Sequence, residues 1–157
     1  ELHKAVQEID NLGLPPGRGN LLNAIGRCII DDSYNANVVS MQYAIDNLGR
    51  KSGGKKIALL GEMRELGDHG PLMHHEVLES CKKLDAVLTV GRAFCDSGEI
   101  LGAKLLQHAE SAGDIDLDRL AAYTDPGDTI LVKGSNAIFW RHQFVDRLVS
   151  AIKNRRT

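Results

Sequence analysis

The sequence is short of aromatic residues and of net charge, and each shortage excludes a class of protein. Phe, Trp and Tyr make up only 4% of the 157 residues, which argues against a surface that stacks nucleic-acid bases. The 19 Lys and Arg residues nearly balance the 21 Asp and Glu residues, leaving a formal charge of −2. Because nucleic-acid-binding proteins carry broad positive surfaces, we expect no nucleic acid among the partners.

Signals for membranes and for the secretory route are also missing. No apolar run approaches the roughly 20 residues of a membrane span, and the charged residues 1–4 are unlike a signal peptide. The three cysteines, Cys28, Cys81 and Cys95, are odd in number and widely spaced, which argues against a disulfide framework and a Cys-based zinc site. Reduced thiols indicate a cytoplasmic protein.

Three signatures of catalysis or nucleotide binding are absent. The chain has no GxxxxGK[ST] phosphate loop, no GxGxxG after its first strand and no GxSxG nucleophile turn. No cysteine has a partner motif for nucleophilic catalysis. The residues alone therefore indicate a domain with polar loops and no complete active site.

What the sequence does contain is an alternation of short apolar runs and helical patterns. Its length is close to the about 150 residues of one domain, and 43% hydrophobic residues can build a sizeable core. Nearly all-apolar runs are typical of buried parallel strands. They occupy residues 28–30, 57–60, 86–90 and 129–132, with a weaker run at 104–108.

Helical periodicity fills the segments between these runs. Alternating βα units predict an α/β fold, a Rossmann-like, doubly wound, mostly parallel sheet of about six strands with an N-terminal hairpin or antiparallel edge strand. The apolar stripes comprise Val38, Met41, Ala44, Ile45 and Leu48; Val77, Leu78, Cys81 and Leu84; Ala93 and Leu101; residues 115–123; and Ile138, Val145, Leu148, Val149 and Ile152.

The first 19 residues do not fit this alternation. Leu2, Val6 and Ile9 form one helical face, and the Pro- and Gly-containing residues 11–17 end any helix. Because the chain starts at Glu1 rather than at Met, we expect a fragment of a larger protein.

A β-hairpin is predicted to open the compact unit. Residues 21–25 and 28–32 flank Gly26 and Arg27, which could form the turn. We therefore assign residues 1–19 to a linker or a preceding domain, and residues 20–157 to one α/β domain.

Ligands of open parallel sheets bind beyond the carboxyl ends of the strands, so the loops at that edge are the candidate sites. Residues 31–37 collect two carboxylates, two hydroxyls and two amides directly after a predicted strand. Such a loop could bind a ribose or a small zwitterion. Helix capping by Asn35 or Asn37 explains it equally well.

Two further loops invite a ligand and have plainer explanations. Residues 133–136 could bind an anion at a helix N-terminus, or form a tight turn with Ser135 or Asn136 as the N-cap. Residues 61–69, with His69 and the following His74 and His75, could suggest a metal, but the spacing lacks a helical ligand pair and favours exposed histidines. Arg18, between two glycines, could reach a phosphate or simply be solvated on a flexible hinge.

Taken together, the loops resemble those of the C-terminal domain of the Mur ligases. The similarity rests on Gly17-Arg18, on residues 31–37 (DDSYNAN), on residues 60–67 (LGEMRELG) and on residues 132–135 (VKGS), and it covers essentially the whole chain. Within the family, DDSYNAN is most similar to the members that add D-alanyl-D-alanine to UDP-N-acetylmuramoyl-tripeptide. The resemblance implies a cytoplasmic, monomeric, ATP-dependent ligase that forms an acyl phosphate in peptidoglycan precursor synthesis.

The same resemblance implies roles for individual residues. ATP would be bound by Arg18 (phosphates), Asp32 (ribose) and Asn35, and D-alanyl-D-alanine by Tyr34, Asn35, Asn37, Lys133 and Ser135. His74 would support the loop at Glu62. No metal ligand is expected here, because the Mg²⁺ ligands and the phosphate loop would lie in a central domain, so the chain alone should be inactive.

Two alternatives stay open on the sequence. The chain could be the corresponding domain of another Mur ligase or of a folylpolyglutamate synthetase, which DDSYNAN argues against. It could also be a stand-alone α/β module that binds a small ligand. A phosphate loop encoded upstream of Glu1 would favour the ligase.

Overall fold

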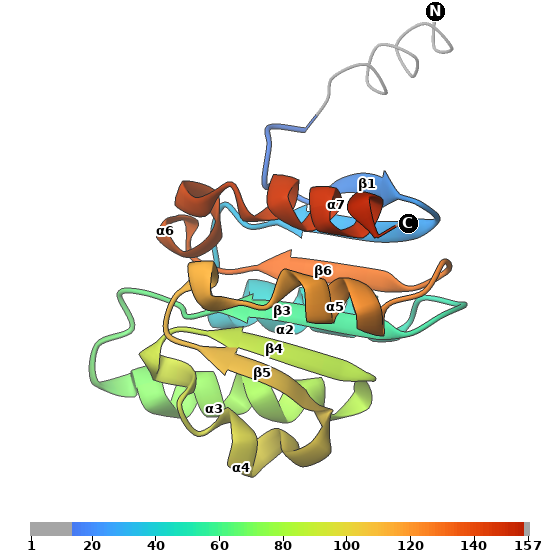
Figure 1. Cartoon of the computed structure of the whole chain (residues 1–157). Coiled ribbons are helices and arrows are strands. Elements are labelled where there is room, and N and C mark those ends of the chain that lie inside the picture. Colours follow the sequence, from blue (N-terminus) through green and yellow to red (C-terminus); the bar gives the residue numbers. More distant parts are fainter. Residues whose placement is uncertain (1–13, 156–157) are drawn as a thin grey trace, which may run out of the picture.

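The computed structural model describes residues 14–155, which form one six-stranded sheet in the order β1-β2-β6-β3-β4-β5 (Figure 1). β1 and β2 are antiparallel, and every other neighbouring pair is parallel. The predicted Rossmann-like sheet with an antiparallel edge strand is thus confirmed. The strands are β1 (Asn20–Ala24), β2 (Arg27–Asp32), β3 (Lys56–Gly61), β4 (Ala86–Val90), β5 (Leu105–Ala109) and β6 (Thr129–Lys133).

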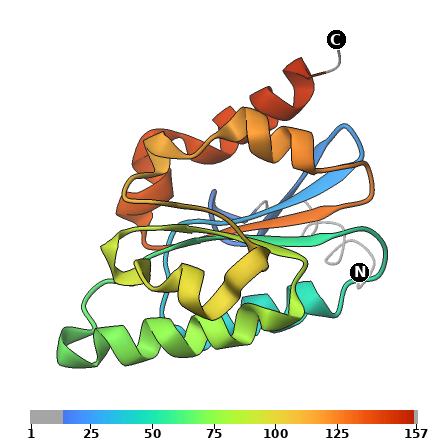
Figure 2. The same cartoon turned by 60° about the horizontal axis from the view of Figure 1, so that its bottom comes forward.

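Helices cover both faces of the sheet (Figure 2). On one face lie α2 (Val38–Gly49), α3 (Gly70–Ser80) and α4 (Ser97–Leu101), and on the other α5 (Leu117–Tyr123) and α7 (Phe144–Asn154). Every residue of β4 and β6 is buried between the two layers, as expected for strands that are apolar on both faces. Within residues 14–155, no helix is long and apolar enough to cross a membrane.

The hairpin turn lies one residue earlier than the sequence predicted. Ala24 pairs with Arg27, so the two loop residues are Ile25 and Gly26, and both have positive φ angles (50° and 77°). Two-residue hairpin loops favour this backbone because it matches the twist of the strands. Arg27 instead belongs to β2, and its guanidinium donates to the Thr124 carbonyl oxygen at 2.5 Å.

The predicted continuous C-terminal helix is wrong, because the chain forms two helices there. Ile138 lies on the short α6 (Asn136–Phe139), which is followed by a 3₁₀ turn, Trp140–His142. Gln143 then adopts a left-handed backbone with φ 45°, which no continuous helix accommodates. α7 starts at the next residue with its own apolar stripe.

Two other helical predictions need similar correction. The stripe from Ala93 to Leu101 is a 3₁₀ turn (Arg92–Phe94) followed by α4, and Phe94 rather than Ala93 is buried. α3 ends at Ser80, so Cys81 and Leu84 pack into the core from the 3₁₀ turn Cys81–Lys83 and the residue after it. The predicted helical face of Leu2, Val6 and Ile9 lies outside the described residues.

A buried carboxylate fastens the amino end of β6. Asp128 is 3% exposed, and it accepts hydrogen bonds from the backbone N–H groups of Lys55 (2.7 Å) and Asp125 (2.8 Å). The Lys55 ammonium lies 3.3 Å from Asp128 Oδ2. Burial alone would raise the Asp128 pKa, but these donors and the ammonium outweigh it and lower the pKa below its ordinary value.

We predict that Asp128 makes the fold acid-sensitive. Since its pKa is lower in the folded state, its contribution is complete above the unfolded pKa and is lost as pH falls through the folded pKa. Asp128→Asn should lower the free energy of unfolding at pH 7 by about 1–3 kcal/mol, and the difference from wild type should shrink below about pH 4. Urea titrations from pH 7 to pH 3 measure this. Glu76→Gln, at an exposed helix position, is the control; a constant Asp128→Asn deficit would contradict the linkage.

Candidate functional site

The candidate site lies at the carboxyl edge of the sheet, where β2, β6 and β3 end side by side. The register pairs Asp32 of β2 with Lys133 of β6, and Lys133 with Leu60 of β3. The loops that follow these three strands therefore converge. They enclose a cleft of about 470 Å³ lined by Tyr34, Asn35, Asn37, Arg64, Glu65 and Ser135, among others.

A buried ion pair forms the floor of this edge. The Lys133 ammonium lies 2.7 Å from Asp32 Oδ2 and donates at 3.0 Å to the carbonyl oxygen of Asn35. The Lys133 side chain is only 3% exposed, whereas that of Asp32 is 29% exposed. Lys133 thus ties the loop after β2 to the end of β6, and any ligand carboxylate would share an ammonium already engaged by protein oxygens.

The two asparagines of the first loop have different local roles. Asn37 is the N-cap of α2: its Oδ1 accepts from Ser40 N–H at 2.8 Å, and Ser40 Oγ accepts from Asn37 N–H at 3.1 Å. Asn35 accepts from the adjacent Ala36 N–H and does not cap the helix. Capping therefore explains Asn37, while both side chains still line the cleft.

Two glycines bring β3 and β6 unusually close where their loops begin. A Cβ atom on Gly134 would lie 2.8 Å from Gly61 Cα, and one on Gly61 would lie 2.7 Å from Ile138 Cγ2. This contact lets α6 pack directly on the strand ends. The sequence predicted an anion site or a tight turn at residues 133–136 and not this close approach; a glycine directly after or at the end of each strand was the available signal.

Arg18 lies on a segment that is hydrogen-bonded to the end of β2 and the loop after it, and not on a free hinge. Gly17 accepts from Tyr34 N–H at 2.9 Å, and Gly19 donates to the Asp31 carbonyl at 2.8 Å. The Arg18 guanidinium lies over the Tyr34 ring, 4.3 Å from its centroid. The loop of residues 31–37 therefore sets the direction of Arg18.

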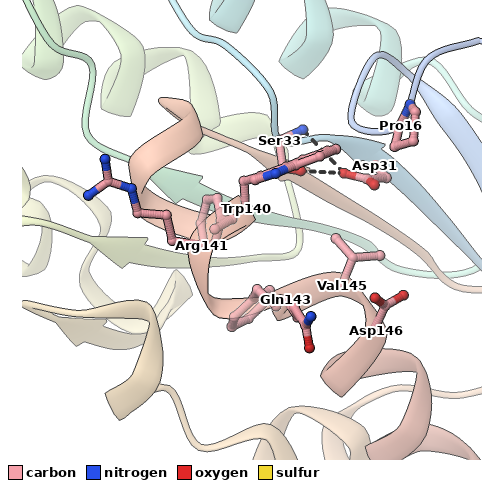
Figure 3. A pocket seen from close by; sticks show the side chains of 10 residues that line it. Pro16, Asp31, Ser33, Trp140, Arg141, Gln143, Val145 and Asp146 are labelled. Carbon is pink, nitrogen blue, oxygen red and sulfur yellow. Dashed lines mark hydrogen bonds between the residues drawn. The ribbon is translucent and has the colours of Figure 1, made fainter.

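Trp140 completes this cluster, and sequence reasoning missed it. Its ring meets Tyr34 edge-on, with centroids 6.0 Å apart, and it is 44% exposed. It also borders a second cavity of about 510 Å³, between Pro16, the end of β2 and the start of α7 (Figure 3). In that view Asp31 and Ser33 bond to each other, and Arg141 is directed away from them.

His74 has the structural role suggested by its sequence position. It is 2% exposed; its Nε2 accepts from Met63 N–H at 2.9 Å, so Nδ1 carries the proton and donates to the Gly70 carbonyl at 2.7 Å. This fixes the loop that follows β3. Across residues 14–155, no three His, Cys, Asp or Glu side chains gather as a metal site.

The cysteines lie away from the cleft. Burial raises the pKa of the Cys81 thiol to about 12, so it stays protonated. The exposed Cys95 donates to Asp96, and this hydrogen bond raises its pKa as well. Neither thiol is suited to act as a nucleophile.

Comparison with known proteins identifies a family whose matched region contains the cleft residues. A family model described as "Mur ligase, glutamate ligase domain" matches residues 17–136, which include the cleft and its floor. The chain belongs to this family. The match covers both loops that the ion pair joins.

The chain is also similar in sequence to individual proteins that share one name. The chain is 36% identical over 115 residues to the UDP-N-acetylmuramoyl-tripeptide–D-alanyl-D-alanine ligase of Bacillus subtilis, covering 71% of the chain and 23% of that protein. It is 31% identical over 113 residues to the enzyme of the same name from Synechocystis, covering 70% of the chain and 25% of that protein. This Mur ligase domain thus spans about a quarter of the length of these relatives.

A solved structure supports the same relationship. The crystal structure of the MurF ligase from Thermotoga maritima in complex with ADP superposes with a TM-score of 0.79 at 28% identity. The match covers 96% of this chain and 34% of that one. The fold of the described residues is therefore that of a domain within a longer Mur ligase.

We predict that the contact of Gly134 with Gly61 is needed for stability. Gly134→Ala places a methyl group against backbone that cannot move aside, and it should lower the free energy of unfolding by about 1–3 kcal/mol. Gly98→Ala is the matched control, because the nearest atom to its Cβ is Leu105 Cδ2 at 3.8 Å. Urea midpoints compare the two, and equal midpoints would show that the strand ends can separate.

Proposed function

We propose that this chain is the C-terminal domain of an ATP-dependent ligase that adds D-alanyl-D-alanine to UDP-N-acetylmuramoyl-tripeptide in the cytoplasm. The observation that carries the proposal is the cleft in which the DDSYNAN loop meets the loop after β6. The relatives that bear this name share about a third of their residues with the chain over the same region. In this proposal residues 1–19 end a central ATPase domain, and residues 20–157 form the C-terminal domain.

The reaction joins a carboxylate to an amine in two displacements. The tripeptide carboxylate attacks the γ-phosphorus of ATP, giving an acyl phosphate and ADP. The amino group of D-alanyl-D-alanine then attacks the carbonyl carbon, expels inorganic phosphate and loses a proton, which forms the peptide bond. Holding ATP and dipeptide together at one domain edge supplies the proximity that this sequence requires.

Asp32 is suited to the ATP ribose. Its Oδ2 is held by Lys133, whereas its Oδ1 has no hydrogen-bond partner among residues 14–155 and can accept from a hydroxyl group. Arg18 is exposed and would contact the phosphates, because a guanidinium fork matches phosphate oxygens. Asn35, also on the cleft wall, would add a contact to ATP.

The dipeptide would be held by the polar wall of the cleft. Tyr34, Asn35 and Asn37 line one side, and Ser135 lines the other. Ser135 begins α6, and its hydroxyl makes no cap bond there, so it can donate to a carboxylate. Lys133 would lie below the dipeptide carboxylate, which would share an ammonium that also contacts Asp32 and the Asn35 carbonyl oxygen.

Mg²⁺ accompanies ATP in reactions of this kind, and the described residues offer no group of three carboxylate, imidazole or thiolate ligands for it. We therefore assign no Mg²⁺ ligand to this part of the chain. Its ligands would lie in the central domain, as the phosphate loop would.

We predict that the 157-residue chain has no ligase activity by itself. An acyl phosphate hydrolyses unless water is excluded, and an open cleft cannot exclude it without a second domain. Phosphate release and product formation, measured with tripeptide substrate, ATP and D-alanyl-D-alanine, should be absent for the chain and present for the three-domain protein. Calorimetry should show at most weak binding of ATP and dipeptide. Turnover by the chain alone would refute the split site.

Asp32→Asn in the three-domain protein tests the ribose assignment. It retains the shape of the side chain, so we expect the KM for ATP to rise about tenfold, since a hydrogen bond to a charged group is typically worth about 1.5–3 kcal/mol. The KM for D-alanyl-D-alanine should rise less than the KM for ATP, because Asp32 would affect the dipeptide only through Lys133. Asp118→Asn, on the exposed face of α5, is the control. Unchanged ATP kinetics would rule the assignment out.

A further inference from the structure

The side chain of Arg18 is held in place without using its hydrogen-bond donors. The guanidinium lies 4.3 Å from the centroid of the Tyr34 ring. Among residues 14–155 it has no hydrogen bond and no ion pair; only the backbone N–H of Arg18 is bonded, to Asn20 Oδ1 at 3.2 Å. A cation held by the face of an aromatic ring keeps its N–H groups available to an anion.

Tyr34 is itself fixed from two sides. Its backbone N–H donates to the Gly17 carbonyl, next to Arg18 in the chain, and its ring packs against the edge of Trp140. Gly17 is buried in this corner, where a Cβ atom would lie 3.1 Å from Trp140 Cζ3 and 3.1 Å from Tyr34 Cβ. Its φ of 78° also favours glycine.

Trp140 reaches this corner from the turn that directly follows α6. α6 ends at Phe139, and the 3₁₀ turn Trp140–His142 directs the ring toward the loop after β2. The loop after β2 and the turn after α6 therefore both contact the segment that carries Arg18. Tyr34 is 38% exposed and Trp140 is 44% exposed. Packing in the hydrophobic core therefore does not explain this aromatic pair.

We propose that Tyr34 and Trp140 are positioning residues that orient Arg18 toward a polyphosphate anion. Tyr34 supplies the surface on which the guanidinium rests, and Trp140 fixes the Tyr34 ring and covers Gly17. This inference rests on the proposed function for the identity of the anion, the phosphates of ATP. It adds a second role for Tyr34 to the dipeptide contact proposed above.

The arrangement can be tested in the 157-residue chain with inorganic tripolyphosphate as the probe. In ¹⁵N-edited NMR spectra at low salt, the Arg18 side-chain Nε–H and Hδ signals should be shifted upfield by the Tyr34 ring. Tripolyphosphate should shift the Arg18 Nε–H signal in a saturable manner. Trp140 is the one tryptophan of the chain, so its fluorescence gives a second reading of the same corner.

Variants separate positioning from general stability. Tyr34→Leu should abolish the upfield shift and weaken tripolyphosphate binding about two- to fivefold, the range for an exposed cation–π contact. Tyr34→Phe should preserve both, and Trp140→Leu should weaken binding in the same direction. Tyr43→Leu removes another exposed tyrosine, on α2, and is the matched control. Unfolding midpoints confirm that each variant is folded.

A double-mutant cycle with Arg18→Gln decides the question. If Tyr34 acts through Arg18, Tyr34→Leu should have no further effect on tripolyphosphate binding once Arg18 is replaced. The proposal is overturned by an equal loss in both backgrounds, by unchanged or tighter binding in Tyr34→Leu, or by no response of Arg18 to the probe. Failure of the proposed ligase function would appear separately, as absent ligation by the three-domain protein.

Discussion

The pairing of Lys133 with Asp32 is the constraint on which the candidate site depends. An ammonium that is almost fully buried is costly unless several oxygens satisfy it, and here a carboxylate and a carbonyl do so. Because the carbonyl belongs to Asn35, the same contact fixes the loop after β2. The position of the cleft wall is therefore set by the electrostatics of one side chain on the central strand β6.

A charged side chain at each end of β6 joins this strand to a different neighbouring segment of the sheet. At its amino end Asp128 accepts from two backbone N–H groups and faces Lys55, so it joins the turn before β3 to β6. At its carboxyl end Lys133 joins β6 to β2, and the Gly134–Gly61 contact joins it to β3. These contacts fix the ends of the three strands relative to one another.

The sequence predicted the parts of this structure that local patterns encode. Apolar runs located the parallel strands, and polar residues after them located the edge and the cleft residues Tyr34, Asn35, Asn37 and Ser135. What depended on tertiary contacts was not predictable. The left-handed backbone of Gln143, a residue without a strong turn preference, breaks the C-terminal helix. The contacts of Trp140 with Tyr34 and of Tyr34 with Arg18 also join segments that are far apart in the sequence or lie in different loops.

At this edge of the sheet, the polar groups of the buried floor are hydrogen-bonded within the domain, whereas some polar groups of the exposed rim are not. The floor contains Lys133 and His74, which are hydrogen-bonded to other parts of the domain. The rim contains Arg18 and Asp32 Oδ1, which are paired to no polar group within residues 14–155. Polar groups of a fixed edge that stay unpaired bind a ligand with little reorganisation, but an open edge leaves them in competition with water. In the proposed function this edge forms a complete site only when another domain covers it; the chain spans about a quarter of the length of its relatives.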